Sequence, residues 1–375
     1  MRKPLVVLKR LCIERLRCLR QVELTLAPTV NIFVGPNAAG KTSVLEAIYL
    51  LSRGKSFRTR HTTELIQSGE QVCRCVAQAS ASGGAVHRLG IELTRAGRRV
   101  RVDGRTVRSA RELTRFLRVQ VVDPESHRLV SGGPGNRRGL LDWGGFHVEP
   151  KFPAQWVEYG RALTQRNALL RVGAPDREVA PWEHALALAG ERLTAQRAKW
   201  ISELTRLVAE ELEYVMPECV LRLEFRRGWP EGRTLEEALA AARTGDRRVG
   251  YTRVGPHRAD VVLTTGLGPA ARMLSQGQQK LLVLALVIAQ FRLVSERTGG
   301  GGVLLVDDLA AELDRHHWEI AMARLRALGV QLVVTALDEA VAMMPGNEEA
   351  QLFHVEQGVV RDTGRRASHV VAPQG

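Results

Sequence analysis

The stretch that decides the fold is Gly35-Pro36-Asn37-Ala38-Ala39-Gly40-Lys41-Thr42, which fits the pattern GxxxxGK[ST]. A short apolar run, Val30–Val34 (VNIFV), precedes it, and apolar residues recur with helical spacing from Val44 to Leu51 after it. These patterns predict a buried strand, a glycine-containing loop and an amphipathic helix. That order is the context that the motif requires, so we expect a phosphate-binding loop here.

The residues of this loop are suited to holding a nucleoside triphosphate. Glycines let the backbone wrap around phosphate oxygens, while successive N–H groups and the helix N-terminus supply positive potential. Lys41 would reach the β and γ phosphates and contribute to catalysis, and Thr42 would hold Mg²⁺. We therefore expect ATP to contact Gly35, Pro36, Asn37, Ala38, Ala39, Gly40, Lys41 and Thr42.

A second apolar strand, Val303–Val306 (VLLV), ends in two carboxylates. Asp307 would bind Mg²⁺ directly or through water, and Asp308 would orient or deprotonate the water that attacks the γ phosphate. Many strands end in acidic turns, so this pattern alone is weak. Beside a phosphate-binding loop it predicts a metal site at Thr42 and Asp307 and a catalytic role for Asp308.

The segment Leu274–Lys280 (LSQGQQK) stands before a long apolar helical run. Taken alone, it could be a helix start capped by serine. Together with the other two motifs it resembles LSGGQ, the signature of ATP-binding-cassette ATPases, with Gln276 in place of the first glycine. In that class the segment binds the γ phosphate held by the other subunit. The resemblance implies an ATP site completed across a dimer by Ser275, Gly277 and Gln278.

Weaker features fit the same class. Gln120, assigned to the end of the strand Val119–Val122 (VQVV), is placed like its Q-loop glutamine and is expected to act in catalysis. Ala310–Asp314 (AAELD) is similar to its D-loop. The histidine that many cassette ATPases carry after the next strand is missing, because Thr335–Asp338 (TALD) follows. We therefore expect slow hydrolysis.

Charge and composition favour a polyanionic partner. The formal net charge is +14, which favours nucleic acid bound with salt-dependent affinity, although an arginine-rich surface can also be merely solvated. Ten arginines fall between Arg88 and Arg118, where alternation and glycine turns predict antiparallel strands with the arginines on one face. No apolar run reaches the roughly 18 residues of a spanning helix, no signal peptide is apparent, and the cysteines lack zinc or disulfide spacing. We expect a cytoplasmic protein with no membrane partner.

The nucleotide motifs lie toward the two ends of the chain. Val303–Val306 and Val330–Thr335, with a predicted helix at His316–Leu328 between them, indicate a parallel β-α-β unit. We expect residues 1–118 and 265–375 to form one α/β domain with a mixed or parallel sheet, the head of an ATP-binding-cassette ATPase.

The middle of the chain has a different character. Ala154–Arg171 and Pro181–Val215 show helical periodicity, and Pro181 is suited to the first turn of its helix. Few strand signals and no sustained heptads occur there. We expect residues 119–264 to form an inserted, mainly helical arm.

Several segments of the chain resemble one family, the RecF proteins of bacterial recombination repair. The N-terminal pattern LKRLCIERLRCL, followed by VNIFVGPNAAGKTSVLEAIYLLSRGKSFRT, carries the resemblance first. Ala39 departs from the usual serine, and Cys18 stands where asparagine often follows the arginine. Further matching segments are Leu129–Pro134 (LVSGGP), Arg137–His147 (RRGLLDWGGFH) and Tyr251–Asp260 (YTRVGPHRAD).

Membership in this family would imply an ATP-dependent homodimeric clamp on double-stranded DNA, acting at gap junctions in recombinational repair and the SOS response. It would imply RecR, and sometimes RecO, as partners, loading of RecA, and a weak DNA-dependent ATPase activity that resets the clamp. Arg17 matches an arginine expected to approach the nucleotide, and the helical insertion corresponds to the family's arm. Nothing in the amino-acid sequence resembles a helix-turn-helix or zinc finger, so the chain would bind DNA through its phosphates whatever the base sequence.

Three other classes share some of these features. A transporter ATPase has all three motifs, but its compact cassette leaves no space for the long stretch between Lys41 and Ser275. A Rad50-like or SMC-like machine would carry long heptad arrays. A nuclease of the overcoming-lysogenisation type would need an acidic nuclease domain, for which no length remains after Asp314; incubation with plasmid DNA and metal separates that class.

Overall fold

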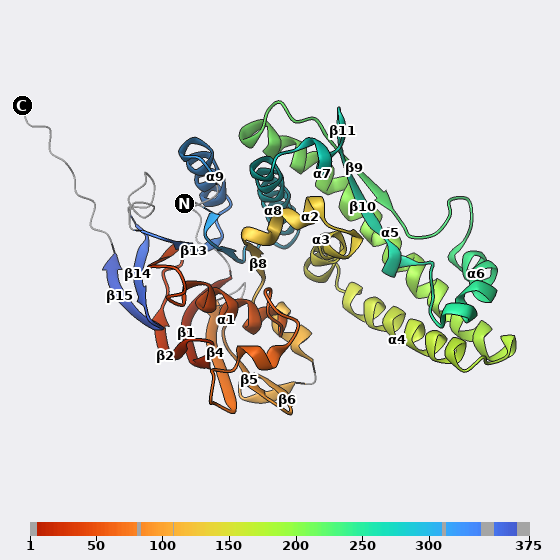
Figure 1. Ribbon diagram of the computed structural model, residues 1–375, viewed down its shortest axis with the longest axis horizontal. Helices are drawn as coiled ribbons and strands as arrows, with labels where there is room; N and C mark the ends of the chain where they lie inside the picture. The colour runs from red at the N-terminus through yellow and green to blue at the C-terminus, as the bar shows by residue number, and fades with distance from the viewer. Residues whose placement is uncertain (1–5, 81–83, 108, 310–312, 339–348, 366–375) are drawn as a thin grey trace, which may run out of the picture. The chain divides into compact units, whose positions relative to one another are not determined.

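The computed structural model describes residues 6–80, 84–107, 109–309, 313–338 and 349–365 (Figure 1). Two compact units arise: residues 1–126 with 294–375 form unit 1, and residues 127–293 form unit 2. These divisions differ from the expected 118/119 and 264/265, because the segments after each expected boundary continue to pack with the unit before it. Within the described ranges, no helix combines the length and apolar character needed to cross a bilayer.

Unit 1 contains a six-stranded sheet around β3 (Val30–Val34), the strand predicted before the phosphate-binding loop. All neighbouring pairs are parallel except β14 with β15. Strands buried on both faces read as continuous apolar runs, which is why VNIFV and VLLV were recognisable. The predicted parallel β-α-β unit is confirmed. Across the sheet the order is β15 (Val359–Arg365), β14 (Gln351–Glu356), β3, β13 (Gln331–Ala336), β12 (Val303–Val306) and β8 (Val119–Val122).

A second sheet in unit 1 is antiparallel throughout. Helix α1 (Lys41–Arg53) packs against side chains from both sheets in one hydrophobic core, so it is buried on nearly every side. The other helical segments described in unit 1 are α9 (Arg315–Ala327), η1 (Thr62–Leu65), η2 (Ala110–Arg115) and η3 (Pro124–His127), the last of which crosses the boundary between Ser126 and His127. The order of this sheet is β2 (Leu19–Thr25), β1 (Val7–Leu16), β4 (Val72–Ser80), β5 (Val86–Thr94), β6 (Gly97–Val102) and β7 (Arg105–Val107).

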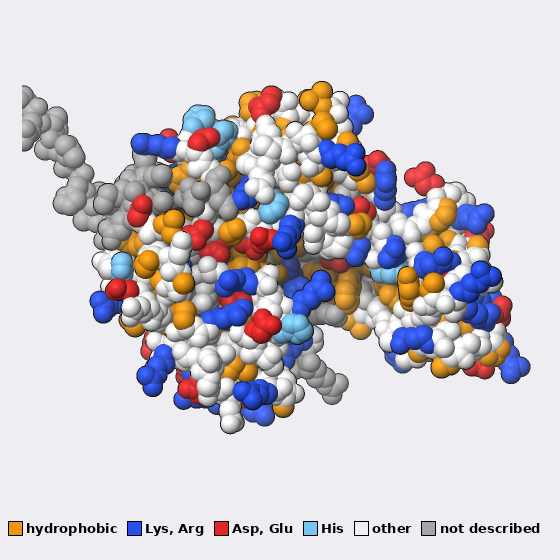
Figure 2. Space-filling view, in the orientation of Figure 1, with side chains coloured by type: hydrophobic (Ala, Val, Ile, Leu, Met, Phe, Trp, Pro, Cys, Tyr) orange, Lys and Arg blue, Asp and Glu red, His pale blue; other side chains and the backbone are white. Residues whose placement is uncertain are grey.

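The arginine-rich strands are antiparallel as predicted, but their arginines do not all share one face. The register pairs Gly90 with Arg101 and Glu92 with Arg99, which places Arg99 and Arg101 on the outer face. Arg98 alternates to the opposite face and donates to the backbone carbonyl of Gly54, so the single-face expectation is wrong there. Figure 2 shows Lys and Arg side chains scattered over both units, with acidic side chains among them. All of Arg108 and the side chain of Arg111 lie outside the described structure.

Unit 2 is mainly helical, as predicted, and has its own hydrophobic core. Its longest helix, α5, covers Asp176–Val215. Pro181 lies inside this helix and not in its first turn, which corrects the expected start: Pro175 precedes the helix, and Asp176 and Glu178 supply the acidic first turn. The other helices are α2 (Arg128–Ser131), α3 (Pro134–Val148), α4 (Phe152–Arg171), α6 (Leu235–Val249), η4 (Pro256–Arg258) and α7 (Ala270–Met273).

A small three-stranded sheet in unit 2 was not predicted. It has the order β11 (Gly268–Pro269), β10 (Asp260–Thr265) and β9 (Leu221–Arg226). The strands β9 and β10 are short and half-exposed, and a long helical segment separates them in sequence, so each lacks a neighbouring hairpin signal. Helix α8 (Gln276–Thr298) begins in unit 2 and ends in unit 1. The signature-like segment therefore lies in unit 2.

Candidate nucleotide site

The loop after β3 closes around the ammonium group of Lys41. Its Nζ donates to the backbone oxygens of Gly35 at 2.8 Å and Pro36 at 3.0 Å. Ala38 takes a left-handed conformation with φ 62°, which turns the chain back on itself. A Cβ at Gly35 would stand 2.0 Å from the carbonyl oxygen of Val355, so only glycine fits where the loop passes β14. The loop is therefore a preformed cradle with a cation at its centre.

Turns from both ends of the chain hold this cradle from outside. Gly40, with φ 117°, is also restricted by its surroundings, because a Cβ there would lie 3.0 Å from Sγ of Cys18 and from a methyl carbon of Leu19. The backbone N–H of Gly358, in the turn between β14 and β15, donates to the carbonyl of Ala39 at 2.8 Å. The phosphate-binding loop thus has fixed walls on two sides.

A chain of hydroxyl groups connects α1 to the acidic end of β12. Thr42 donates to Oδ1 of Asp307 at 3.0 Å, and Thr335 donates to the same oxygen at 2.7 Å. The Thr335 hydroxyl in turn accepts the backbone N–H of Asp308 at 2.9 Å. Burial raises the pKa of Asp307, the two hydroxyls oppose that shift, and the carboxylates of Asp308 and Asp123 add to it. A cation beside Asp307 would relieve this cost.

Asp308 has an oxygen available for a ligand. It takes a left-handed conformation with φ 48°, and its Oδ1 is buried without a hydrogen-bond partner among the described residues. The described part of the chain holds no group of three His, Cys, Asp or Glu that could bind a metal by itself. Thr42 and Asp307 nevertheless suit Mg²⁺, which commonly takes one or two protein ligands and completes its shell with water and phosphate oxygens.

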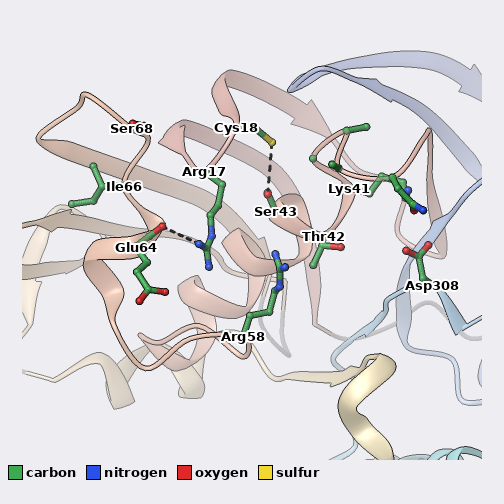
Figure 3. Close-up of a pocket in the computed structure, with 14 residues that line it drawn as sticks. Arg17, Cys18, Lys41, Thr42, Ser43, Arg58, Glu64, Ile66, Ser68 and Asp308 are labelled. Atoms are coloured by element: carbon green, nitrogen blue, oxygen red, sulfur yellow. Dashed lines mark hydrogen bonds between the residues drawn. The ribbon is translucent and has the colours of Figure 1, made fainter.

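These residues open into a cavity of about 720 Å³, large enough for a nucleotide (Figure 3). Eight of the residues expected at the nucleotide line it, whereas Gly35 and Pro36 contribute only their carbonyls to Lys41 and Asp307 lies behind Thr42. The lining residues are Arg17, Cys18, Asn37, Ala38, Ala39, Gly40, Lys41, Thr42, Ser43, Arg58, Glu64, Ile66, Ser68 and Asp308.

Arg17 lines the cavity but is held by its own chain. Its Nε and Nη2 each donate to the Glu46 carboxylate at 3.1 Å, and Nη1 donates to the carbonyl of Glu64 at 3.0 Å. The hydrogen bond that Arg17 donates to Glu46 raises the pKa of Arg17, and burial opposes that shift. Arg17 therefore supports the wall of the cavity, and its contact with a nucleotide stays a prediction.

Arg58 is a cavity residue that sequence reasoning missed. It is exposed, makes no ion pair within the described ranges, and extends toward Thr42 in Figure 3. Its loop is anchored because Ser56 donates to the buried carboxylate of Glu46 and accepts the backbone N–H groups of Arg58 and Thr59. The segment KSFRT was visible in the family resemblance, but no periodicity or motif gave its arginine a role.

Gln120 is not where its expected role would place it. It is the second residue of β8 and pairs with Leu304, so it is not at the end of the strand, and it does not line the cavity. The residue that follows β8 is Asp123, whose pKa burial raises and whose charge acts on Asp307. The catalytic role of Gln120 stays a prediction, and its position within β8 and outside the cavity does not support it.

The signature-like residues form the predicted helix start in unit 2. Ser275 and Gln278 cap α8 reciprocally: the Gln278 side chain accepts the Ser275 N–H at 2.9 Å, and Ser275 Oγ accepts the Gln278 N–H at 3.3 Å. Ser275 is exposed, and a Cβ at Gly277 would meet only open space. The segment is thus accessible to a second molecule. Residues 310–312 of the D-loop-like run lie outside the described structure.

Comparisons with known proteins agree on one family. The model of the RecF/RecN/SMC N-terminal domain matches residues 7–361. The chain is 43% identical over 358 residues to the DNA replication and repair protein RecF of Thioalkalivibrio sulfidiphilus, covering 95% of this chain and 99% of the relative. It is 40% identical over 360 residues to RecF of Pseudomonas entomophila, covering 95% and 98%.

Solved structures share the fold. The structure of the recombination mediator protein RecF-ATP in the RecFOR pathway has a TM-score of 0.86 at 23% identity, over 96% of this chain and 98% of that one. An Smc head domain from Pyrococcus furiosus, with an extended coiled coil and bound to the C-terminal domain of ScpA, has a TM-score of 0.59 at 14% identity, over 95% of each chain. The cavity, the fold and the relatives together lead to one conclusion: this chain belongs to the RecF family of DNA replication and repair proteins.

Proposed function

We propose that this protein is an ATP-dependent homodimeric clamp on double-stranded DNA, in which slow hydrolysis serves release. The observation that carries the proposal is the cradle of residues 35–42 with Lys41 Nζ at its centre, opening into a cavity beside Asp308. Such a loop binds triphosphates through backbone N–H groups and one lysine. A solved structure with the same fold is described as RecF-ATP, which supports the same ligand.

The residues of the cavity would have separate roles in binding and hydrolysing ATP. Lys41 would exchange its two backbone oxygens for β and γ phosphate oxygens, and the loop N–H groups would orient the chain of phosphates. Thr42 and Asp307 would hold Mg²⁺, which when bound neutralises charge on the phosphates. Asp308, with its unpartnered oxygen, would position a water near the γ phosphate.

The dimer is proposed from the accessible signature segment. Ser275 and Gly277 lie at the exposed start of α8, where the helix dipole favours an anion. If they bind the γ phosphate held by a second copy, ATP binding becomes subunit association, and hydrolysis becomes release. The positive net charge would then hold DNA through its phosphates, independent of sequence.

The pathway is proposed from the relatives. A similar structure is described as a recombination mediator in the RecFOR pathway. For this chain we infer RecR, and in some settings RecO, as protein partners at DNA gaps, with loading of RecA as the outcome. Pull-down of each purified partner with ATP and gapped DNA, and without them, tests this part separately.

The central test uses Lys41→Met beside Lys55→Met, an exposed lysine that does not line the cavity. We expect Lys41→Met to lose ATP-dependent dimers in analytical ultracentrifugation and ATP-dependent retention of duplex DNA, while Lys55→Met keeps both. Ser275→Arg should bind ATP as a monomer without dimerising. Unchanged dimerisation and DNA retention in Lys41→Met would refute the mechanism.

The rival classes have their own outcomes. A nuclease would nick or linearise plasmid DNA in the presence of Mg²⁺ or Mn²⁺ and ATP. A transporter subunit would show no ATP-dependent affinity for duplex DNA at moderate salt. The long helix α5 packs against α4 and α6 within unit 2, so it does not resemble a free coiled-coil arm of an SMC-like machine.

A further inference from the structure

The segment 256–260 of unit 2 belongs to the family-like run YTRVGPHRAD, to which the nucleotide site assigns no role. Its first part is fixed by buried partners. Arg197 donates to the carbonyl of Pro256 at 2.8 Å. His257 stands between the hydroxyl of Tyr159, 2.6 Å from Nδ1, and the carbonyl of Thr252, 2.9 Å from Nε2. A neutral imidazole with its proton on Nε2 satisfies both contacts.

The last part of the segment is fixed from α3. Arg138 donates to the carbonyl of Ala259 at 3.3 Å. Arg137 forms a two-pronged ion pair with Asp260, through Nε at 2.7 Å and Nη2 at 3.0 Å. The backbone N–H of Arg258 also donates to the carbonyl of Gly255 at 2.8 Å, so all five residues from 256 to 260 have a side chain or backbone group held in place. The side chain of Arg258 has no such partner among the described residues.

Arg258 is exposed on this rigid segment, and it makes no ion pair within the described ranges. Its neighbour Arg138 is half-buried, and among the described residues its one hydrogen-bond partner is the carbonyl of Ala259, the residue after Arg258. This contact brings the two arginines together. Burial lowers the pKa of Arg138, and the guanidinium groups of Arg197 and Arg258 lower it further.

The carboxylates that could neutralise this pair are already occupied. Both oxygens of Asp260 bind Arg137. Oδ1 of Asp142 accepts two bonds from Arg197, and its Oδ2 accepts the indole N–H of Trp156 at 3.3 Å. The excess positive charge is therefore built into the packing of the segment.

We propose that Arg138 and Arg258 form a binding pair for the phosphate backbone of double-stranded DNA. A guanidinium presents planar, paired donors that match phosphate oxygens, and a pre-positioned one loses less entropy on binding. A phosphodiester would accept from donors that are not bonded to Asp260 or Asp142. This inference rests on the proposed DNA clamp and assigns part of its DNA contact to unit 2.

The contact is with phosphate and not with bases. Arg258 lies on the short 3₁₀ turn η4 and Arg138 lies near the start of α3, and their guanidinium groups present the paired donors that phosphate oxygens accept. The pair would therefore contribute affinity that is equal on all duplex sequences and falls with salt.

The test compares Arg138→Gln, Arg258→Gln and their double variant with wild type. Glutamine keeps a donor for the Ala259 carbonyl while removing the charge. Arg206→Gln is the control, because Arg206 is an exposed arginine of unit 2 that has its own carboxylate, Glu210. Fluorescence anisotropy with ATP, on two unrelated 30-base-pair duplexes across a salt series, gives affinity and salt slope. ATP binding and thermal melting check the fold.

We expect the double variant to bind both duplexes roughly tenfold more weakly or worse. The slope of log K against log salt should become shallower by about 1 for each phosphate that the variant no longer binds, with ATP binding and melting unchanged. Wild-type affinity and slope in the double variant would overturn the inference while leaving the clamp intact, as would an equal loss in Arg206→Gln. Failure of wild type to bind duplex with ATP would overturn the clamp and this inference together.

Discussion

Replacing Glu46 with glutamine removes a negative charge from a fully buried position on α1. The carboxylate accepts two bonds from Arg17, both at 3.1 Å, and the hydroxyl of Ser56. Losing one partner of a buried ion pair costs about 3–5 kcal/mol. The Arg17 side chain is 26% exposed, whereas that of Glu46 is 0% exposed, so solvent screens part of the freed charge. We therefore expect a loss of about 2 kcal/mol.

That loss should appear as a melting temperature about 4–8 °C lower for a unit of this size, measured by calorimetry without nucleotide. Because Glu46 also anchors Ser56 and the loop of Arg58, ATP affinity should fall as well, measured with a fluorescent ATP analogue. The control is Glu23→Gln, which breaks an exposed pair with Arg10 and should change stability by at most about 0.5 kcal/mol. Wild-type melting and wild-type ATP affinity in Glu46→Gln would refute the reasoning.

Three further outcomes are expected. Arg58→Ala should weaken ATP binding roughly tenfold, while Arg60→Ala, exposed and outside the cavity, should not; equal titration curves would contradict this. Asp307→Asn keeps an oxygen that accepts from both hydroxyls and removes a buried charge, so the nucleotide-free variant should melt no lower than wild type. The rise in melting temperature that Mg²⁺ adds to the rise with ATP alone should vanish in this variant. Burial lowers the pKa of His257 below its ordinary value of 6.5, so the unfolded chain binds a proton at a higher pH than the folded protein does. The free energy of unfolding should therefore fall as the pH drops below about 6.5. The melting temperature of His257→Gln should depend less on pH between about 7.5 and 5.5 than that of wild type, and an equal dependence would contradict this reasoning.

The head could be read from sequence because its signals are local. Val30–Val34 and Val303–Val306 are buried on both faces, so continuous apolar runs mark both strands with their observed bounds. The loop between β3 and α1 has a fixed pattern, because each of its glycines meets a neighbouring backbone or side chain. In this loop, the glycines that the motif requires are also the residues that the neighbouring chain restricts, so the sequence motif predicts the structure.

Features that depend on distant partners were missed or misplaced. Gln120 was assigned to the end of a strand, but the carboxyl end of β8 is set by its pairing with β12, which no local pattern encodes. Arg98 lies on the face opposite Arg99 because successive strand residues alternate, and there the sequence-distant carbonyl of Gly54 accepts its side chain. Strand β9 joins β10 across a long helical segment, and Arg58 reaches the cavity only because buried Glu46 holds its loop.

The turn at Gly358 contacts the phosphate-binding loop, and Val355 limits Gly35 to glycine. A growing polypeptide therefore cannot complete this wall until β14 and Gly358 have been synthesised. Folding of N-terminal segments usually begins during synthesis. For this protein the phosphate-binding loop would lack this wall until then, so nascent chains halted before β14 should not be retained on immobilised ATP.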